Sequence, residues 1–301
     1  MANTPITSFQ DIESEWESVL QECPADTLFL TPQWQKVWWD TFGDGRTMCG
    51  FSYHFPDGSA GDGVAAIASL AKSGDTVTFM GSQDTFDYND FPIRPGHEEG
   101  FYRALLECME EQDCRTLRLD SLRESSPTLE LFAEMARGRG YTVDIEQEDV
   151  TSGIDLPGTW DEYLSSLSRK DRHELRRKLR RLESVEDWRW YSVSDPQEVS
   201  ERLGDFLELM RMSDPEKAEF LTPERELFFH RMAQRTAELG LIKLFFLEMD
   251  QIPSRQLRCP GLLFFLEVGR IGLSCWEVWK PRMWRHVSLS VRHSSASSTV
   301  D

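Results

Sequence analysis

Apolar residues recur at helical spacing in some segments of the chain, while in others they form short runs bounded by turn residues. Residues 8–23 place four apolar side chains on one helical face: Ile12, Trp16, Val19 and Leu20. Ser8 stands at the capping position, so this pattern predicts a helix. Thr31 followed by Pro32 predicts the start of a second helix, which ends near Gly43.

Short apolar runs with turn residues between them follow these helices. The runs predict strands over 48–55, 64–70 and 77–80, with turns at 57–58 and 73–75. This spacing is typical of an antiparallel meander. Further along, the pattern predicts helices over 98–111 and 127–137, and strands over 116–119 and 141–145.

A second unit is predicted to begin near Asp149. Its predicted strands are 154–156, 188–193 and 241–249. Its predicted helices are 160–167, 168–184, 196–212 and 222–239. The two halves have a similar order of elements, and the whole pattern predicts an α+β fold with sheets flanked by helices.

Length and charge limit the function classes. The chain has 301 residues, enough for one large domain or two smaller ones, and a net charge of −19. That charge disfavours binding of duplex DNA by general attraction and repels anionic membranes. No run approaches the roughly 18 apolar residues of a membrane helix, and the N-terminus lacks signal-peptide features, so we expect a cytoplasmic protein.

The six cysteines form no C-x-x-C pair and have no histidine at zinc-ligand spacing, so we expect free thiols and no metal site. Nucleotide-binding, zinc-protease and serine-hydrolase motifs are also absent from the sequence.

Residues 168–181, SRKDRHELRRKLRR, are strongly basic within this acidic chain, with eight Lys or Arg among fourteen residues. Leucines on one face predict a helix that packs on that side and shows its charges to solvent. One interpretation is a solvated surface balanced by acidic neighbours, and a nucleic-acid face is another. A third is a site for an anionic group of a substrate or cofactor, because Arg and Lys bind phosphate well. The candidate residues are Arg169, Lys170, Arg172, Arg176 and Arg177.

A second candidate site is the loop 84–91, which follows a predicted strand. Asp87, Tyr88 and Asp90 place two carboxylates and a phenol on this loop. Such a loop can hold an amine or supply a general base. The alternative is a polar turn in which Tyr88 and Phe91 are buried.

The last 51 residues differ from the rest. Residues 251–301 have a net charge of +4, against −23 for residues 1–250, and they hold three of the ten tryptophans. Their hydrophobic period is also hard to assign, which indicates a change in the chain after Asp250.

Three segments together resemble the FemAB-like branch of the GNAT acyltransferases, the group that includes CelD-type proteins of polysaccharide gene clusters. The strongest likeness is residues 154–182, IDLPGTWDEYLSSLSRKDRHELRRKLRRL; the loop Asp87-Tyr88-Asn89-Asp90-Phe91 and residues 29–34, FLTPQW, add to it. The resemblance covers roughly residues 8–253 and implies two GNAT-like units in tandem.

The activity that this resemblance implies is transfer of an acyl group from acyl-CoA, usually acetyl-CoA, to an amine of an amino sugar, an amino acid or a cell-envelope precursor. It implies an acceptor side at Asp87, Tyr88 and Asp90, and an anion-binding role for the basic residues at 169–177. The alternative is a non-catalytic, degenerate GNAT fold that binds an anionic partner through residues 168–181.

The chain departs from that family near Pro253. The expected strand pair, turn and closing helix are replaced, and the GNAT cofactor signature is not matched. We hypothesise a shifted reading frame after Pro253; a genuine divergent tail is the alternative. The predicted organisation is a first unit at 1–148, a second, incomplete unit at 149–253, and a basic tail at 254–301, which would pack poorly if out of frame.

Overall fold

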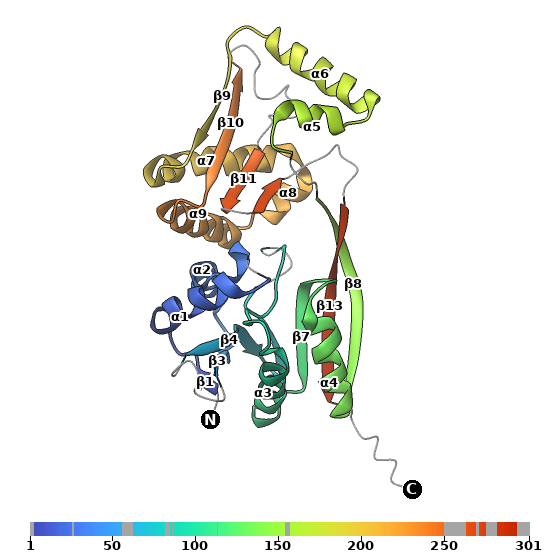
Figure 1. Cartoon of the computed structure of the whole chain (residues 1–301). Coiled ribbons are helices and arrows are strands. Elements are labelled where there is room, and N and C mark those ends of the chain that lie inside the picture. Colours follow the sequence, from blue (N-terminus) through green and yellow to red (C-terminus); the bar gives the residue numbers. More distant parts are fainter. Residues whose placement is uncertain are drawn as a thin grey trace. The chain divides into compact units, whose positions relative to one another are not determined.

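The computed structural model describes residues 3–25, 27–55, 63–81, 85, 87–112, 114–153, 157–249, 263–268, 271–274 and 282–293. The chain divides into two compact units (Figure 1). Unit 1 comprises Met1–Thr151 with Met283–Asp301, and unit 2 comprises Ser152–Arg282. Each unit combines β-sheet with helices, so the predicted α+β fold class is confirmed.

Unit 1 holds two sheets and several helices in its described residues. The strands are β1 (Asn3–Pro5), β2 (Thr47–Met48), β3 (Phe51–His54), β4 (Val64–Ala68), β5 (Leu70–Ser73), β6 (Thr76–Phe79), β7 (Thr116–Arg123), β8 (Tyr141–Gly153) and β13 (Arg282–His293). The helices are α1 (Phe9–Glu22), the 3-10 turn η1 (Leu28–Leu30), α2 (Pro32–Phe42), α3 (Glu98–Glu111), the π-helical η2 (Thr128–Phe132) and α4 (Ala133–Gly138).

The described strands of unit 1 form two sheets. One sheet is β1-β3-β4, and the other is β2-β5-β6-β7-β13-β8. Within the larger sheet β6 and β7 run parallel, whereas β2–β5, β5–β6 and β7–β13 are antiparallel. Its core is formed by fully buried side chains, including Phe101, Tyr102, Leu106, Leu117 and Phe132.

Two predicted strands of the meander are each interrupted, the first at Cys49 and Gly50 and the second at Ser69. The segment 48–55 splits at Gly50, where a Cβ atom would lie 2.4 Å from the Ala68 carbonyl oxygen. The segment 64–70 splits at Ser69, whose hydroxyl donates to Gln35 Oε1 over 2.9 Å. Each break moves the chain from one sheet to the other, and the predicted antiparallel pairing on either side is confirmed.

Several helices start with a side-chain cap, whereas α1 and α3 do not. Thr31 Oγ1 accepts from Trp34 N, with Pro32 at the first helical position, as predicted. Ser8 precedes α1, but its hydroxyl donates to the Gln10 side chain, so the predicted side-chain cap is wrong. The predicted helix at 127–137 consists of η2 and α4 in succession.

The strand β13 was not predicted. It lies between β7 and β8, and Val287, Leu289 and Val291 are buried in unit 1. Poor packing, expected of an out-of-frame tail, is therefore not observed over 287–292. The segment alternates apolar and polar residues from 287 to 292, which is the period of a half-buried strand.

Unit 2 contains a four-stranded antiparallel sheet of order β12-β11-β10-β9. Its strands are β9 (Trp188–Val193), β10 (Lys243–Met249), β11 (Leu263–Val268) and β12 (Ile271–Ser274). Its helices are α5 (Trp160–Ser166), α6 (Arg169–Glu183), α7 (Pro196–Ser213), α8 (Pro215–Phe220) and α9 (Pro223–Glu238). The sequence did not predict β11, β12 and α8 in unit 2 or β1 in unit 1. The predicted strand at 154–156 and the predicted turn at 57–58 lie outside the described residues.

Candidate functional site

The loop that carries Asp87, Tyr88 and Asp90 is held from two sides within unit 1. The Asn89 N–H donates to the Ser121 carbonyl of β7 over 3.0 Å. Beyond the loop, Ile67 N donates to Pro92 O over 2.9 Å, and Arg94 N donates to Ala65 O over 2.9 Å. The loop therefore spans from the end of β7 to the edge of β4.

Asp90 is a buried carboxylate at the centre of a hydrogen-bond network. Its Oδ1 accepts from Phe91 N over 2.9 Å and from Thr128 Oγ1 over 2.8 Å. Thr128 Oγ1 also lies 3.0 Å from the Tyr102 hydroxyl. Burial raises the pKa of Asp90, while hydrogen bonds from Ser126, Thr128 and Phe91 N oppose that rise. These partners tie the loop to the start of η2.

Tyr88 and Asp87 have different surroundings from Asp90. The Tyr88 ring is buried beneath Arg123, whose guanidinium carbon lies 4.4 Å from the ring centroid. Asp87 is exposed. Tyr88 and Phe91 are both buried, as the interpretation of this loop as a polar turn requires. Of the three predicted residues, Asp87 is the one whose side chain faces solvent.

Next to this loop, β7 contains a bulge. Leu122 pairs with Val287 and Leu119 pairs with Leu289, so two residues of β7 stand opposite one residue of β13. The bulge includes Ser121, which has a φ of 62°. A non-glycine residue in this region carries a strain of order 1–3 kcal/mol, and bulges are frequent beside functional sites. Ser121 N donates to Glu148 Oε2 over 2.9 Å, which helps to hold this conformation.

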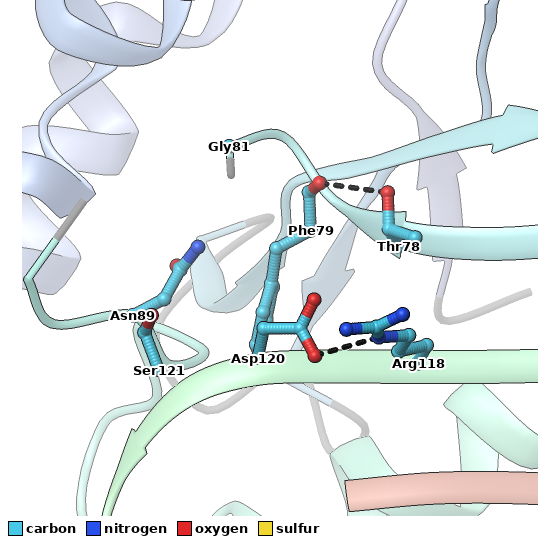
Figure 2. Close-up of a pocket in the computed structure, with 7 residues that line it drawn as sticks. All are labelled: Thr78, Phe79, Gly81, Asn89, Arg118, Asp120 and Ser121. Atoms are coloured by element: carbon cyan, nitrogen blue, oxygen red, sulfur yellow. Dashed lines mark hydrogen bonds and ion pairs between the residues drawn. The ribbon is translucent and has the colours of Figure 1, made fainter. Parts of the chain in front are cut away.

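A small pocket opens where β6 and β7 cease to pair. The last parallel pair is Thr78 with Arg118. Figure 2 shows the lining side chains, with the Arg118 and Asp120 side chains directed toward each other at an Nε–Oδ1 distance of 2.8 Å. The lining residues are Thr78, Phe79, Gly81, Asn89, Arg118, Asp120 and Ser121. The cavity volume is about 10 Å³, which suits a single water molecule.

Sequence reasoning missed Asp120 and Ser121. The signal was a change of alternation in β7, where buried leucines stand at 117, 119 and 122. Side chains alternate between the two faces of a strand, so residues on one face are two positions apart. A spacing of three positions between buried leucines indicates one extra residue in the strand.

The basic residues predicted at 169–177 lie on α6 in unit 2. Ser168 caps this helix by accepting from Asp171 N over 3.2 Å. Arg172 Nη2 donates to Leu167 O over 3.2 Å, and Arg177 forms a two-point ion pair with Glu174 at 2.9 and 2.6 Å. The hydrogen bond from Arg177 lowers the pKa of Glu174.

The other cations of α6 form no ion pair within the described residues. The side chains with no ion-pair partner among the described residues are Arg169, Lys170, Arg176, Lys178, Arg180 and Arg181, all of them exposed. None of the fifteen residues of α6 is buried; Leu175, Leu179 and Leu182 are half-buried. The predicted charged face is thus present, and its leucine stripe is only partly covered.

Another polar cluster of unit 2 lies on β9, β10 and α7. Glu248 accepts from Arg189 Nε over 2.8 Å, from the Tyr191 hydroxyl over 2.6 Å and from Arg202 Nη2 over 3.0 Å. The hydrogen bond from Tyr191 and the one from Arg189 lower the pKa of Glu248. With its acceptors occupied by these donors, this carboxylate joins β9, β10 and α7 and is not a free base.

Thiol and metal chemistry find little support in the described residues. Cys23, Cys49, Cys108 and Cys114 are free thiols, and Cys259 and Cys275 lie outside the described part. Burial raises the pKa of Cys49 to about 12 and that of Cys108 to about 11, so both stay protonated near neutrality. Among the residues searched, no three His, Cys, Asp or Glu side chains gather in a way that suits a metal ion. The described helices include none with the length and apolar character needed to cross a membrane.

Comparison with known families gives one match. Residues 169–253 match the model of an acetyltransferase (GNAT) domain. The match begins at the first residue of α6 and ends at Pro253, where the sequence changes character. The GNAT part of the predicted resemblance is confirmed over these residues, and the FemAB-like, CelD-type branch stays a prediction.

Two solved structures are distantly similar. A conserved protein of unknown function from Bacteroides thetaiotaomicron VPI-5482 has 11% identity and a TM-score of 0.48, covering 87% of this chain and 74% of its own. The ribosomal-protein-S18-alanine N-acetyltransferase from Escherichia coli has 16% identity and a TM-score of 0.32, covering 52% of this chain and 84% of its own. No curated protein matches the chain.

Proposed function

We propose that this protein is an acyl-CoA-dependent N-acyltransferase that acts on an amine of an amino sugar, an amino acid or a cell-envelope precursor. The GNAT acetyltransferase match at 169–253 is the observation that carries this proposal. Acetyl-CoA is the expected donor, and it is a co-substrate that leaves as CoA.

The reaction needs little covalent help from the protein. The amine nitrogen attacks the thioester carbonyl carbon, the carbon–sulfur bond breaks, and the amine loses a proton as the thiolate gains one. Catalysis then consists of holding an unprotonated amine beside the thioester and accepting its proton. Backbone N–H groups directed at the carbonyl oxygen lower the barrier further.

On the acceptor side, we assign the proton-accepting role to Asp87 and supporting roles to Tyr88 and Asp90. Asp87 is exposed and can meet an amine from solvent, whereas Asp90 is buried and accepts from Phe91 N and Thr128 Oγ1. Tyr88, packed under Arg123, fixes the direction in which the loop presents Asp87. These roles follow from the burial of each side chain.

On the donor side, the cations of α6 suit the phosphate groups of CoA. Arg169, Lys170 and Arg176 are exposed and unpaired among the described residues, and guanidinium groups bind phosphate in a two-point geometry. Arg172 and Arg177 already have partners in Leu167 and Glu174, so we expect smaller contributions from them. The small pocket of unit 1 does not have room for CoA.

The test of this assignment is an acetyl-CoA titration monitored by calorimetry and by thermal unfolding. We expect acetyl-CoA to raise the melting temperature, because a ligand that binds the folded state stabilises it. The double variant Arg169→Gln/Arg176→Gln should bind acetyl-CoA at least about tenfold more weakly, the equivalent of about 1.4 kcal/mol. Arg115→Gln, an exposed arginine of unit 1, is the matched control.

Two results would count against the assignment. If acetyl-CoA binds equally well to the double variant, α6 does not hold the donor. If acetyl-CoA neither binds nor stabilises the wild-type protein, the non-catalytic alternative, a degenerate GNAT fold that binds an anionic partner through 168–181, takes precedence.

A further inference from the structure

The C-terminal half of α6 carries charge that the proposed reaction does not use. Lys178, Arg180 and Arg181 are exposed and have no ion-pair partner in the described part of the chain. Arginines elsewhere in the fold are commonly paired, for example Arg103 with Glu99 and Arg211 with Glu208. Residues 168–181 have a net charge of +6, with histidine neutral, in a chain whose total is −19.

Beside these cations lies apolar surface that the fold covers only in part. Leu179 and Leu182 are half-buried, and no residue of α6 is buried. An α-helix of this length spans about 22 Å. A short stretch that combines cations with leucines is typical of a helix that docks in a groove on a protein.

Unit 1 offers a groove with the complementary character. An open hollow of about 800 Å³ runs along the start of η2 and α4. Its lining residues are Glu124, Ser125, Ser126, Pro127, Leu129, Glu130, Glu134 and Arg137. Glu130 and Glu134 are exposed and have no ion-pair partner among the described residues, and Leu129, which lines the same hollow, is half-buried.

We propose that the chain self-associates by docking Lys178–Leu182 of α6 into the acidic groove of a second copy. Arg180 and Arg181 then meet Glu130 and Glu134, and the half-covered leucines meet Leu129. Because helix and groove are different surfaces, the contact is heterologous. A long anionic polymer fits less well, since beyond the helix it would meet the surface of a chain with a charge of −19.

This proposal is independent of the proposed enzymatic function. The cations assigned to CoA lie at 169–177, and the docking cations lie at 178–181. A failure of acetyl-CoA binding therefore leaves self-association untouched, and the converse also holds.

Sedimentation equilibrium of the full chain at low and high salt tests the proposal. We expect a mass above the 34.9 kDa of the monomer at about 50 mM salt, with a dissociation constant at least about tenfold weaker at about 500 mM, because salt screens surface charge. Arg180→Glu/Arg181→Glu and Glu130→Lys/Glu134→Lys should each be monomeric. Arg103→Glu/Arg115→Glu, with the same change in charge at another surface, should associate as the wild type does.

Mixing the two charge-reversed variants gives the decisive result. Each alone has a mismatched helix and groove, but the helix of either variant suits the groove of the other, so the mixture should form mixed oligomers. Thermal unfolding checks that each variant is folded. If Arg180→Glu/Arg181→Glu is not folded, Arg180→Gln/Arg181→Gln is used in its place. The proposal is overturned if the wild-type protein is a monomer at low salt, or if the variants associate as strongly as the wild type. It is also overturned if nucleic acid copurifies with the wild type and is lost when Arg180 and Arg181 are replaced.

Discussion

Asp87 and Asp90 stand three positions apart in the same loop, yet their side chains have opposite environments. Asp87 is exposed, while Asp90 accepts hydrogen bonds from Phe91 N and Thr128 in the interior of unit 1. Spacing in the sequence placed both carboxylates on one loop, and that much could be predicted. The difference in burial between the two carboxylates depends on contacts with Tyr102 and Thr128. These residues come from distant segments, so the sequence of the loop does not reveal the contacts.

Asp90 should make the stability of the protein depend on pH. Burial raises its pKa, so the folded state holds this proton to a higher pH than the unfolded chain does. The contribution of Asp90 to stability is therefore greatest below its unfolded pKa and falls as the pH rises through the folded value. Asparagine does not titrate, so Asp90→Asn should gain stability relative to the wild type between about pH 4 and about pH 7.5.

Urea unfolding of both proteins at the two pH values measures this difference. The exposed Asp87→Asn variant controls for the loss of one negative charge. If the gap between Asp90→Asn and the wild type is the same at both pH values, Asp90 is not buried as described.

At the scale of elements, helical spacing and short apolar runs predicted most helices and strands, and interruptions within those runs were harder to place. Gly50 and Ser69 divide two predicted strands because of close backbone approach and a buried hydroxyl, both set by tertiary contacts. The π-helical η2 was expected as ordinary helix. The bulge of β7, by contrast, had a visible sign in the spacing of its leucines.

The bulge predicts opposite effects for two substitutions of Ser121. Its φ of 62° is accessible to glycine at no steric cost, so Ser121→Gly should keep or raise the melting temperature. Ser121→Val places a β-branched residue at this φ and should lower the free energy of unfolding by more than about 1 kcal/mol. Thermal unfolding of both variants checks this, and equal losses would argue against a strained residue at 121.

At the scale of the molecule, the α+β class could be predicted from element order, but the return of the chain into unit 1 could not. β13 lies 131 residues after Thr151 in a segment whose charge and composition differ from the rest. Strand pairing over such a distance depends on the β7 and β8 edges, which local sequence does not reveal. The packing of β13 favours a tail that takes part in the fold.

Leu289 tests whether the tail supports unit 1. Its side chain is fully buried opposite Leu119, so Leu289→Ala should destabilise unit 1 by about 2–5 kcal/mol through lost contacts and a cavity. Ser290→Ala, at the half-buried neighbouring position, should cost much less. Chemical unfolding curves give both values, and a Leu289→Ala protein as stable as the wild type would mean that the tail does not pack in this way.

The central claim is acyl transfer to an amine, and its most direct test is a mass measurement. The wild-type protein is incubated with deuterated acetyl-CoA and a panel of amino sugars, amino acids and amine-bearing envelope precursors. Acyl transfer predicts a product that is heavier by one deuterated acetyl group on nitrogen, together with an equal amount of released CoA. In Asp87→Ala, we expect neither the acylated product nor the released CoA. Release of CoA without any acylated amine, or no reaction with any acceptor, would contradict it.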